Sequence, residues 1–94
     1  MTLEDLHKEA EHVILSVGDM IYDSRTKSRG FLQSRERRID IVKDDIYIWS
    51  IMWFYQDKRL DYYNNPSFME EMGLKMSILM GTVILYKASG GDND

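Results

Sequence analysis

The residues best suited to chemistry in this chain are the arginines of segment 25–38, which reads Arg-Thr-Lys-Ser-Arg-Gly-Phe-Leu-Gln-Ser-Arg-Glu-Arg-Arg. The segment holds six of the 12 cationic side chains and one of the 16 acids, a local charge of +5 within a chain of net charge −4. A charge asymmetry of this kind indicates either an anionic partner or pairing with the protein's own acids.

Three interpretations of this basic segment are open. It can pair with acids of a helix expected near the N-terminus, bind phosphate or nucleic acid, or dock an acidic protein. Five of its six cations are arginines, whose forked donors favour specific contacts over diffuse attraction, and an aromatic ring among them can stack on a base. The candidate anion- or partner-binding residues are Arg25, Lys27, Arg29, Phe31, Arg35, Arg37 and Arg38.

Two Glu-x-x-His spacings near the N-terminus, Glu4 with His7 and Glu9 with His12, match the ligand spacing of di-iron helical bundles. That chemistry needs such pairs on separate helices that face a shared core, together with further carboxylates. Both pairs lie in one expected helix, and matching motifs are missing from the rest of the sequence. We therefore expect no metal site.

Other acidic residues give no stronger indication of catalysis. Aspartates gather at positions 40, 44 and 45 and again at 57 and 61, and acidic pairs on helices can hold Mg²⁺ for nucleotide hydrolysis. All-α enzymes of that kind use paired glutamate-rich motifs, which this sequence lacks, and it also lacks a glycine-rich phosphate loop, a nucleophile elbow and zinc-ligand spacings. We expect no enzymatic activity and no cofactor.

The composition indicates one soluble globular domain. A chain of 94 residues can bury one hydrophobic core, and 44% apolar with 30% charged residues is typical of a folded protein. The lack of cysteine excludes disulfides, thiolate catalysis and cysteine-ligated metals. The sequence shows no secretory signal, and its apolar stretches are far shorter than the ~20 residues that span a bilayer, so we expect a cytoplasmic protein without a membrane partner.

The elements that would position the basic segment begin with a helix over about 3–22. Thr2 can cap this helix, with Asp5 as the second member of a capping box. Apolar residues then recur at alternating spacings of three and four, which predicts one apolar stripe that faces a core.

The segment that follows allows two interpretations. Residues 38–55 are rich in β-branched and aromatic side chains, which favours a hairpin that turns near Lys43. The positions of Ile39, Val42, Ile46 and Trp49 instead fall on one side of an α-helix. A strand would place large apolar residues on both faces, which one hairpin cannot bury, so we favour a helix over about 35–60.

A third helix is predicted over about 66–88. Asn65 can cap it, Pro66 suits its first position, and Gly90 suits its end. The fold prediction is therefore all-α, a compact three-helix bundle within residues 1–89 that forms a helical homodimer, followed by a mobile tail of residues 90–94.

Second apolar stripes on the last two helices, and a line of small residues at Gly73, Ser77 and Gly81, predict a close helix crossing or an oligomer interface. From these patterns we expect a non-enzymatic interaction module, a small acidic helical adaptor or inhibitor that binds a macromolecular partner. The alternative is binding of nucleic acid or a nucleotide through segment 25–38. The predicted interface residues are Ile41, Ile48, Met52, Tyr55, Gly73, Leu74, Ser77, Ile78, Gly81 and Leu85.

Overall fold

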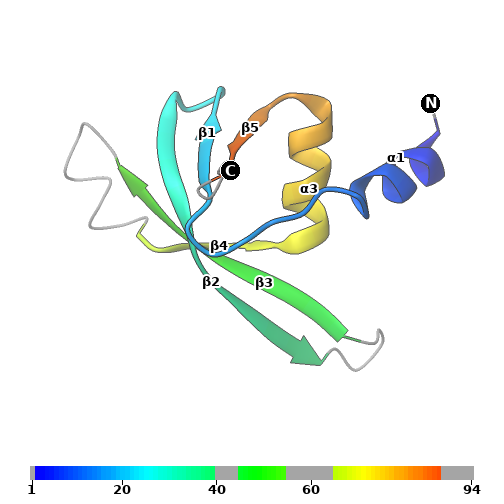
Figure 1. Ribbon diagram of the computed structural model, residues 1–94, viewed down its shortest axis with the longest axis horizontal. Helices are drawn as coiled ribbons and strands as arrows, with labels where there is room; N and C mark the ends of the chain where they lie inside the picture. Colours follow the sequence, from blue (N-terminus) through cyan, green and yellow to red (C-terminus); the bar gives the residue numbers. More distant parts are fainter. Residues whose placement is uncertain (1, 40–44, 55–64, 88–94) are drawn as a thin grey trace, which may run out of the picture.

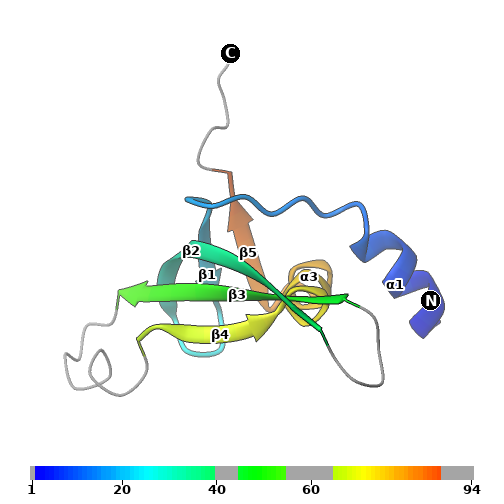
Figure 2. The ribbon, with the colours of Figure 1, turned by 90° about the horizontal axis from the view of Figure 1, so that it is seen from below.

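A five-stranded antiparallel sheet dominates the computed structural model of the protein, which describes residues 2–39, 45–54 and 65–87 (Figures 1 and 2). The strands lie in the order β4-β3-β2-β1-β5, so the chain forms a four-stranded meander and then returns beside its first strand. The elements are α1 (Leu3–Ala10), β1 (Met20–Asp23), β2 (Ser28–Ile39), β3 (Asp45–Phe54), β4 (Ser67–Glu70), α3 (Glu71–Met80) and β5 (Val83–Tyr86).

The prediction of an all-α three-helix bundle, and with it that of a helical homodimer, is therefore wrong. The described residues include two helices, of eight and 10 residues, and both are shorter than predicted. Neither is long and apolar enough to cross a membrane.

The start of α1 is confirmed and its predicted end is wrong. The Asp5 backbone N–H donates to Thr2 Oγ1 at 3.2 Å, and the Thr2 N–H donates to Asp5 Oδ2 at 3.1 Å, which completes the capping box. The helix ends at Ala10 instead of continuing to residue 22, and Gly18 adopts a φ of 95°, which an α-helix cannot accommodate. Residues 20–23 instead pair with both β2 and β5.

The hairpin interpretation holds for the second predicted helix wherever the structure describes it. β2 and β3 pair antiparallel from Arg29 opposite Phe54 to Ile39 opposite Asp45. A hairpin on its own could not bury apolar residues on both faces, but β3 is an inner strand between β2 and β4. One side of β3 carries Trp49, Ile51 and Trp53, which are buried in the core, whereas Ile48, Met52 and Phe54 on its other side stay partly exposed.

The third predicted helix, over about 66–88, is shorter because residues at both of its ends belong to the sheet, as β4 and β5. Residues 67–70 form β4 against β3, and Asn65 contributes no helix cap. Instead, Asn65 Oδ1 accepts the Trp53 backbone N–H at 2.7 Å, and Asn65 Nδ2 donates to the Trp53 carbonyl at 2.8 Å. α3 ends at Gly81, whose φ of 86° gives a left-handed cap.

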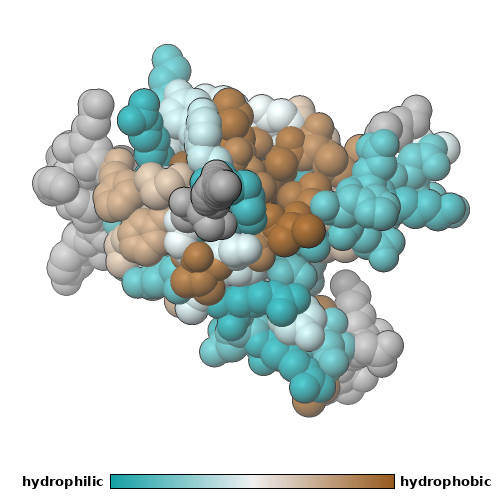
Figure 3. Space-filling model, viewed as in Figure 1, coloured by the Kyte–Doolittle hydropathy of each residue, from teal (hydrophilic) through white to brown (hydrophobic). Residues whose placement is uncertain are grey.

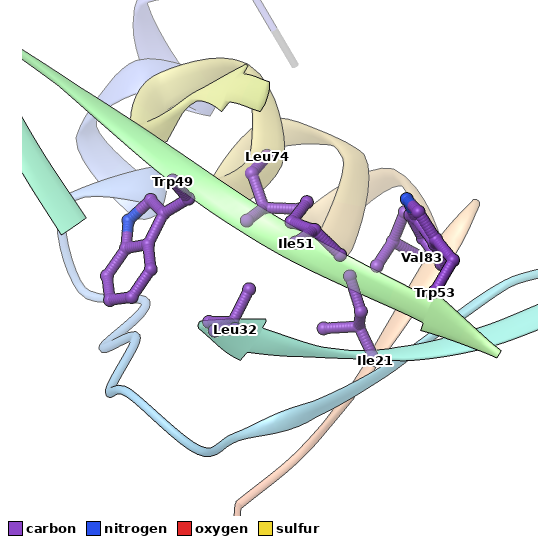
Figure 4. Close-up of a cluster of buried hydrophobic side chains, with 7 residues drawn as sticks. All are labelled: Ile21, Leu32, Trp49, Ile51, Trp53, Leu74 and Val83. Atoms are coloured by element: carbon purple, nitrogen blue, oxygen red, sulfur yellow. The ribbon is translucent and has the colours of Figure 1, made fainter. Parts of the chain in front are cut away.

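The core lies between the inner face of the sheet and α3 (Figure 4). α3 contributes Leu74, which is fully buried against the sheet, while α1 packs on α3. Among the described elements, helices therefore cover one face of the sheet and leave its other face open. The core residues are Ile21, Leu32, Trp49, Ile51, Trp53, Leu74 and Val83.

One close approach inside the core requires glycine. A Cβ atom on Gly30 would lie 2.7 Å from the Met52 carbonyl oxygen and 2.8 Å from Cε3 of Trp53. The Trp53 indole therefore packs directly over the backbone of β2, which only the absence of a side chain permits.

Candidate functional site

The basic segment forms the β1–β2 turn and the whole of β2, and a β-bulge divides its side chains between the two faces of the sheet. Leu32 pairs with Ile51 and Ser34 with Ser50, so Gln33 is the extra residue. The Ser50 hydroxyl donates to Gln33 Oε1 at 2.9 Å across this bulge. Without the bulge, Arg29 and Arg35 would share one face; with it, they lie on opposite faces.

Beyond the bulge, Arg35 belongs to a polar cluster at the edge of the core. Its Nε and Nη2 atoms donate to the two carboxylate oxygens of Glu71, at 2.8 and 3.1 Å, and its guanidinium lies 3.6 Å from the ring centre of Tyr47. The indole N–H of buried Trp49 donates to Glu71 Oε1 at 2.9 Å. The hydrogen bond from Arg35 is the main reason why the pKa of Glu71 lies below its ordinary value, although partial burial acts in the opposite direction.

Three further arginines of the segment also pair with nearby acids. Arg37 donates to Asp45 at 2.9 Å and Arg38 to Glu36 at 2.7 Å, both at the exposed end of the hairpin. In the β1–β2 turn, Arg25 contacts Asp23 at 3.2 Å.

Burial would raise the pKa of Asp23, but hydrogen bonds from the side chain and backbone of Arg25 outweigh it and lower that pKa. Most of the positive charge in the segment is thus neutralised internally. The partners of these arginines lie in β1, β2, β3 and α3, not in α1 as the first interpretation supposed.

The side chains of the two remaining cations, Lys27 and Arg29, form no hydrogen bond or ion pair within the part of the chain that the structure describes. Lys27 lies in the turn with a φ of 56°. Arg29 lies in β2 opposite Tyr22 on one side and Phe54 on the other, and its side chain is exposed.

Arg29 belongs to a regular array of side chains on the uncovered face of the sheet. Directly paired residues share a face, and so do residues two apart along a strand. The pairing of β5, β1, β2 and β3 therefore produces two parallel rows of four residues each. We call these eight residues the outer face: Ile84, Tyr22, Arg29 and Phe54 in the first row, and Tyr86, Met20, Phe31 and Met52 in the second.

The outer face is apolar, aromatic and accessible. Phe54 and Tyr86 are each 53% exposed, and Ile84 is 41% exposed. Phe31 and Phe54 stack with ring centres 5.6 Å apart. Figure 3, in the orientation of Figure 1, shows brown apolar atoms over β5 and also over α3, which packs on the other face of the sheet; the far end of the β2–β3 hairpin and α1 are mostly teal.

A hollow of about 540 Å³ opens on the β1–β5 half of this face. Its volume is within the usual range for ligand sites. Most of its lining consists of outer-face side chains, and Arg29 supplies the single charge among the described residues that line it. The lining residues are Met20, Ile21, Tyr22, Arg29, Ile84 and Tyr86.

A second hollow, of about 480 Å³, lies where α1, β3 and the start of α3 meet. Its lining includes His7, Asp45, Glu70 and Glu71. Two of these carboxylates are already engaged, Asp45 by Arg37 and Glu71 by Arg35. Within the described ranges no group of three histidine or acidic side chains is placed to hold a metal ion, and His7 belongs to no such group.

The predicted interface residues are dispersed. Met52 belongs to the outer face and Ile48 lies on the same side of β3, whereas Leu74 is buried and Ile78 and Leu85 pack against the core. Ile41 and Tyr55 lie outside the described residues.

The line of small residues on α3 makes no close crossing with any described element. A Cβ on Gly73 or Gly81 would meet no atom within 4 Å, and the Ser77 hydroxyl donates to the Gly73 carbonyl at 3.0 Å. The outer-face residues contributed by β1 and β5 were not predicted from the sequence. The alternation of inward and outward residues in these strands spans four residues each, too short a pattern to compete with the helical spacing.

Comparisons with protein-family models, with curated proteins and with solved structures each find no match to this chain.

Proposed function

We propose that this protein is a non-enzymatic interaction module that binds a protein partner through the outer face. The observation that carries the proposal is the make-up of that face, which holds four aromatic residues, two methionines, one isoleucine and one arginine, and no acid or lysine. Aromatic residues, methionine and arginine are enriched in protein interfaces, while lysine and the acidic residues are depleted.

The outer face is also unusual for a protein surface because its apolar residues are contiguous. Four neighbouring strands contribute side chains to it without a charged interruption other than Arg29. Contiguous apolar patches on a soluble protein mark interaction sites. Ile39, which is 78% exposed at the hairpin end and lies opposite Asp45, is outside this patch and carries no such implication.

Internal pairing of the arginines weakens the alternative of nucleic-acid binding. Contacts between cations and phosphates supply most of the affinity in such complexes, yet Arg25, Arg35, Arg37 and Arg38 already contact carboxylates of this chain. The protein as a whole is also acidic. These charges favour a protein partner over a polyphosphate backbone.

The test compares two substitutions of the same chemistry at two places. Ile84→Thr removes an apolar contact from the outer face, and Ile39→Thr makes the same change in a strand residue outside it, with β-propensity kept in both. Partners are captured with the tagged wild-type protein, identified, purified and titrated against each variant by calorimetry.

We expect Ile84→Thr to weaken binding about tenfold, as loss of one buried aliphatic contact does, and Ile39→Thr to leave the dissociation constant unchanged. Equal affinity of both variants and the wild type would contradict the proposal. Loss of binding only on charge reversal of Arg35 and Arg37 would place the interaction on the hairpin instead.

A further inference from the structure

Arg29 stands out on the outer face because it is the one charge there and because its surroundings supply no anion. Its two neighbours across the strands are Tyr22 and Phe54, and the hollow that it lines is otherwise apolar or phenolic. We propose that the hollow beside Arg29 binds a carboxylate from a short acidic and aromatic segment of the protein partner. This inference rests on the proposed function and names the chemistry of its partner.

The guanidinium of Arg29 suits a carboxylate for geometric reasons. Its planar fork presents parallel N–H donors that match the two oxygens of a carboxylate. The same pairing occurs within this protein, where Arg35 holds both oxygens of Glu71. Arg29 has no such acceptor among the described residues, and the proposal assigns that acceptor to the partner.

The surroundings of Arg29 favour an acid that is carried by an apolar body. Tyr22 and Phe54 flank the guanidinium, while Ile84, Tyr86 and Met20 form the rest of the hollow. A side chain or backbone that covers these residues would exclude water from the ion pair, and a charged hydrogen bond is stronger in such surroundings. An acid with an aromatic or aliphatic neighbour would supply both the carboxylate for Arg29 and the apolar group that covers the hollow.

The size of the outer face favours a short segment over a second copy of this chain. Four strands at ~4.8 Å and two rows about 7 Å apart cover roughly 270 Å², about a third of the ~800 Å² that each partner contributes to a standard interface. A twofold pair of copies would also bring identical faces together. Such a contact would give Arg29 no carboxylate from the eight outer-face residues; the acids on the same side of the sheet, Glu36 and Glu70, lie beyond them in β2 and β4, and Glu36 is already paired with Arg38.

To test this, random 12-residue peptides displayed on phage are selected for binding to the full chain. In each round, peptides that also bind the Arg29→Gln variant are removed. Enriched peptides are synthesised, and their dissociation constants are measured by fluorescence anisotropy. Each acid of a peptide is then replaced by its amide, alone and together with Arg29→Gln. Lys27→Gln serves as the matched control, because it removes the same charge from the adjacent turn.

We expect enriched peptides that place Asp, Glu or the terminal carboxylate beside an aromatic or aliphatic residue. Arg29→Gln and the acid-to-amide change should each weaken binding about tenfold or more, and the two together little more than either alone, since both remove one charged contact. Lys27→Gln should change affinity less than threefold.

Several outcomes would overturn the inference. Peptides that lack an acid, independent effects of the two substitutions, or a selection that enriches nothing would each contradict a carboxylate site. Peptides without an acid that still lose affinity with Ile84→Thr would refute the inference and leave the proposed function intact. Tighter binding of a labelled 12-residue oligothymidylate than of any peptide, abolished by Arg29→Gln, would assign the hollow to nucleic acid and overturn both.

Discussion

The Glu71 carboxylate provides the sharpest test of the structure, because three groups from two strands depend on it. It accepts both forked donors of Arg35 and the indole N–H of Trp49, whose residue is only 1% exposed. Glu71→Ala would leave the Trp49 N–H buried without this acceptor. It would also remove the ion pair that ties β2 to the start of α3.

The expected change in the free energy of unfolding follows from these two losses. An orphaned buried donor costs about 1–3 kcal/mol, and an ion pair with one half-exposed partner such as Arg35 contributes about 0.2–1 kcal/mol. We therefore expect the free energy of unfolding to fall by about 2 kcal/mol, which lowers Tm by roughly 8–16 °C in a domain of this size. Chemical denaturation followed by tryptophan fluorescence measures the change directly.

The neighbouring Glu70 provides the control. It flanks the same helix start but forms no cap hydrogen bond, so Glu70→Ala should change stability by less than about 0.5 kcal/mol. A similar small effect for Glu71→Ala would refute the assignment of Glu71 as the acceptor for Arg35 and Trp49.

The pH dependence of the same variant gives a second readout with a defined sign. The pKa of Glu71 is lowered in the folded state, mainly by the hydrogen bond from Arg35. Its contribution to stability is therefore complete above the unfolded pKa, near 4.5, and is lost as pH falls through the lower folded pKa. The stability difference between wild type and Glu71→Ala should shrink in acid, whereas a difference that stays constant from pH 7 to pH 3 would contradict this origin.

Three further substitutions test the packing and the strand pairing. Gly30→Ala should destabilise the protein by about 1–3 kcal/mol, because its Cβ would meet the Met52 carbonyl and the Trp53 ring; a neutral result in thermal unfolding would contradict the close approach. Gly73→Ala should instead stabilise it by about 0.5–1 kcal/mol, since the new Cβ meets no described atom and alanine favours the helix; a loss of stability in the same assay would indicate a close helix contact. Asn65→Ala should cost about 1–2 kcal/mol by removing two hydrogen bonds to the Trp53 backbone, and should speed amide exchange at Trp53; unchanged exchange there would argue against this pairing.

Local chemistry was predictable from the sequence where it depends on neighbours in the chain. The Thr2 and Asp5 capping box forms as expected, because both partners lie within one turn. The arginine segment was recognised as the unusual feature, and internal pairing was among its interpretations. Four of its arginines do pair internally, although not with α1.

The sheet was not predicted from the sequence, because it forms by pairing between segments that lie far apart in the chain. Residues 39–53 show helical spacing, yet β3 lies between β2 and β4 and buries Trp49, Ile51 and Trp53 with help from α3. No local pattern states that β4 will pair with β3 or that β5 will return to β1. Pairing between distant strands therefore decides the structure of residues 39–53, because their hydrophobic spacing fits neither a helix nor a strand strongly.

The candidate site could not be predicted either, because it too depends on how the strands pair. A bulge at one residue, Gln33, moves Arg35 to the side of the sheet that faces Glu71 and leaves Arg29 on the other. The sequence therefore shows one basic segment, whereas the structure has a neutralised hairpin and a single arginine within an apolar face.

Methyl cross-saturation in a complex with the captured partner tests the central claim most directly, because it identifies the side chains that the partner contacts. We expect strong attenuation at the methyl groups of Met20, Met52 and Ile84 on the outer face. The methyl groups of Ile39 and Met80, whose residues are 78% and 63% exposed and so more accessible than Met20 or Ile84, should keep their intensity. Attenuation at Ile39 or Met80, with the three outer-face methyl groups unaffected, would show that the partner binds elsewhere and contradict the account.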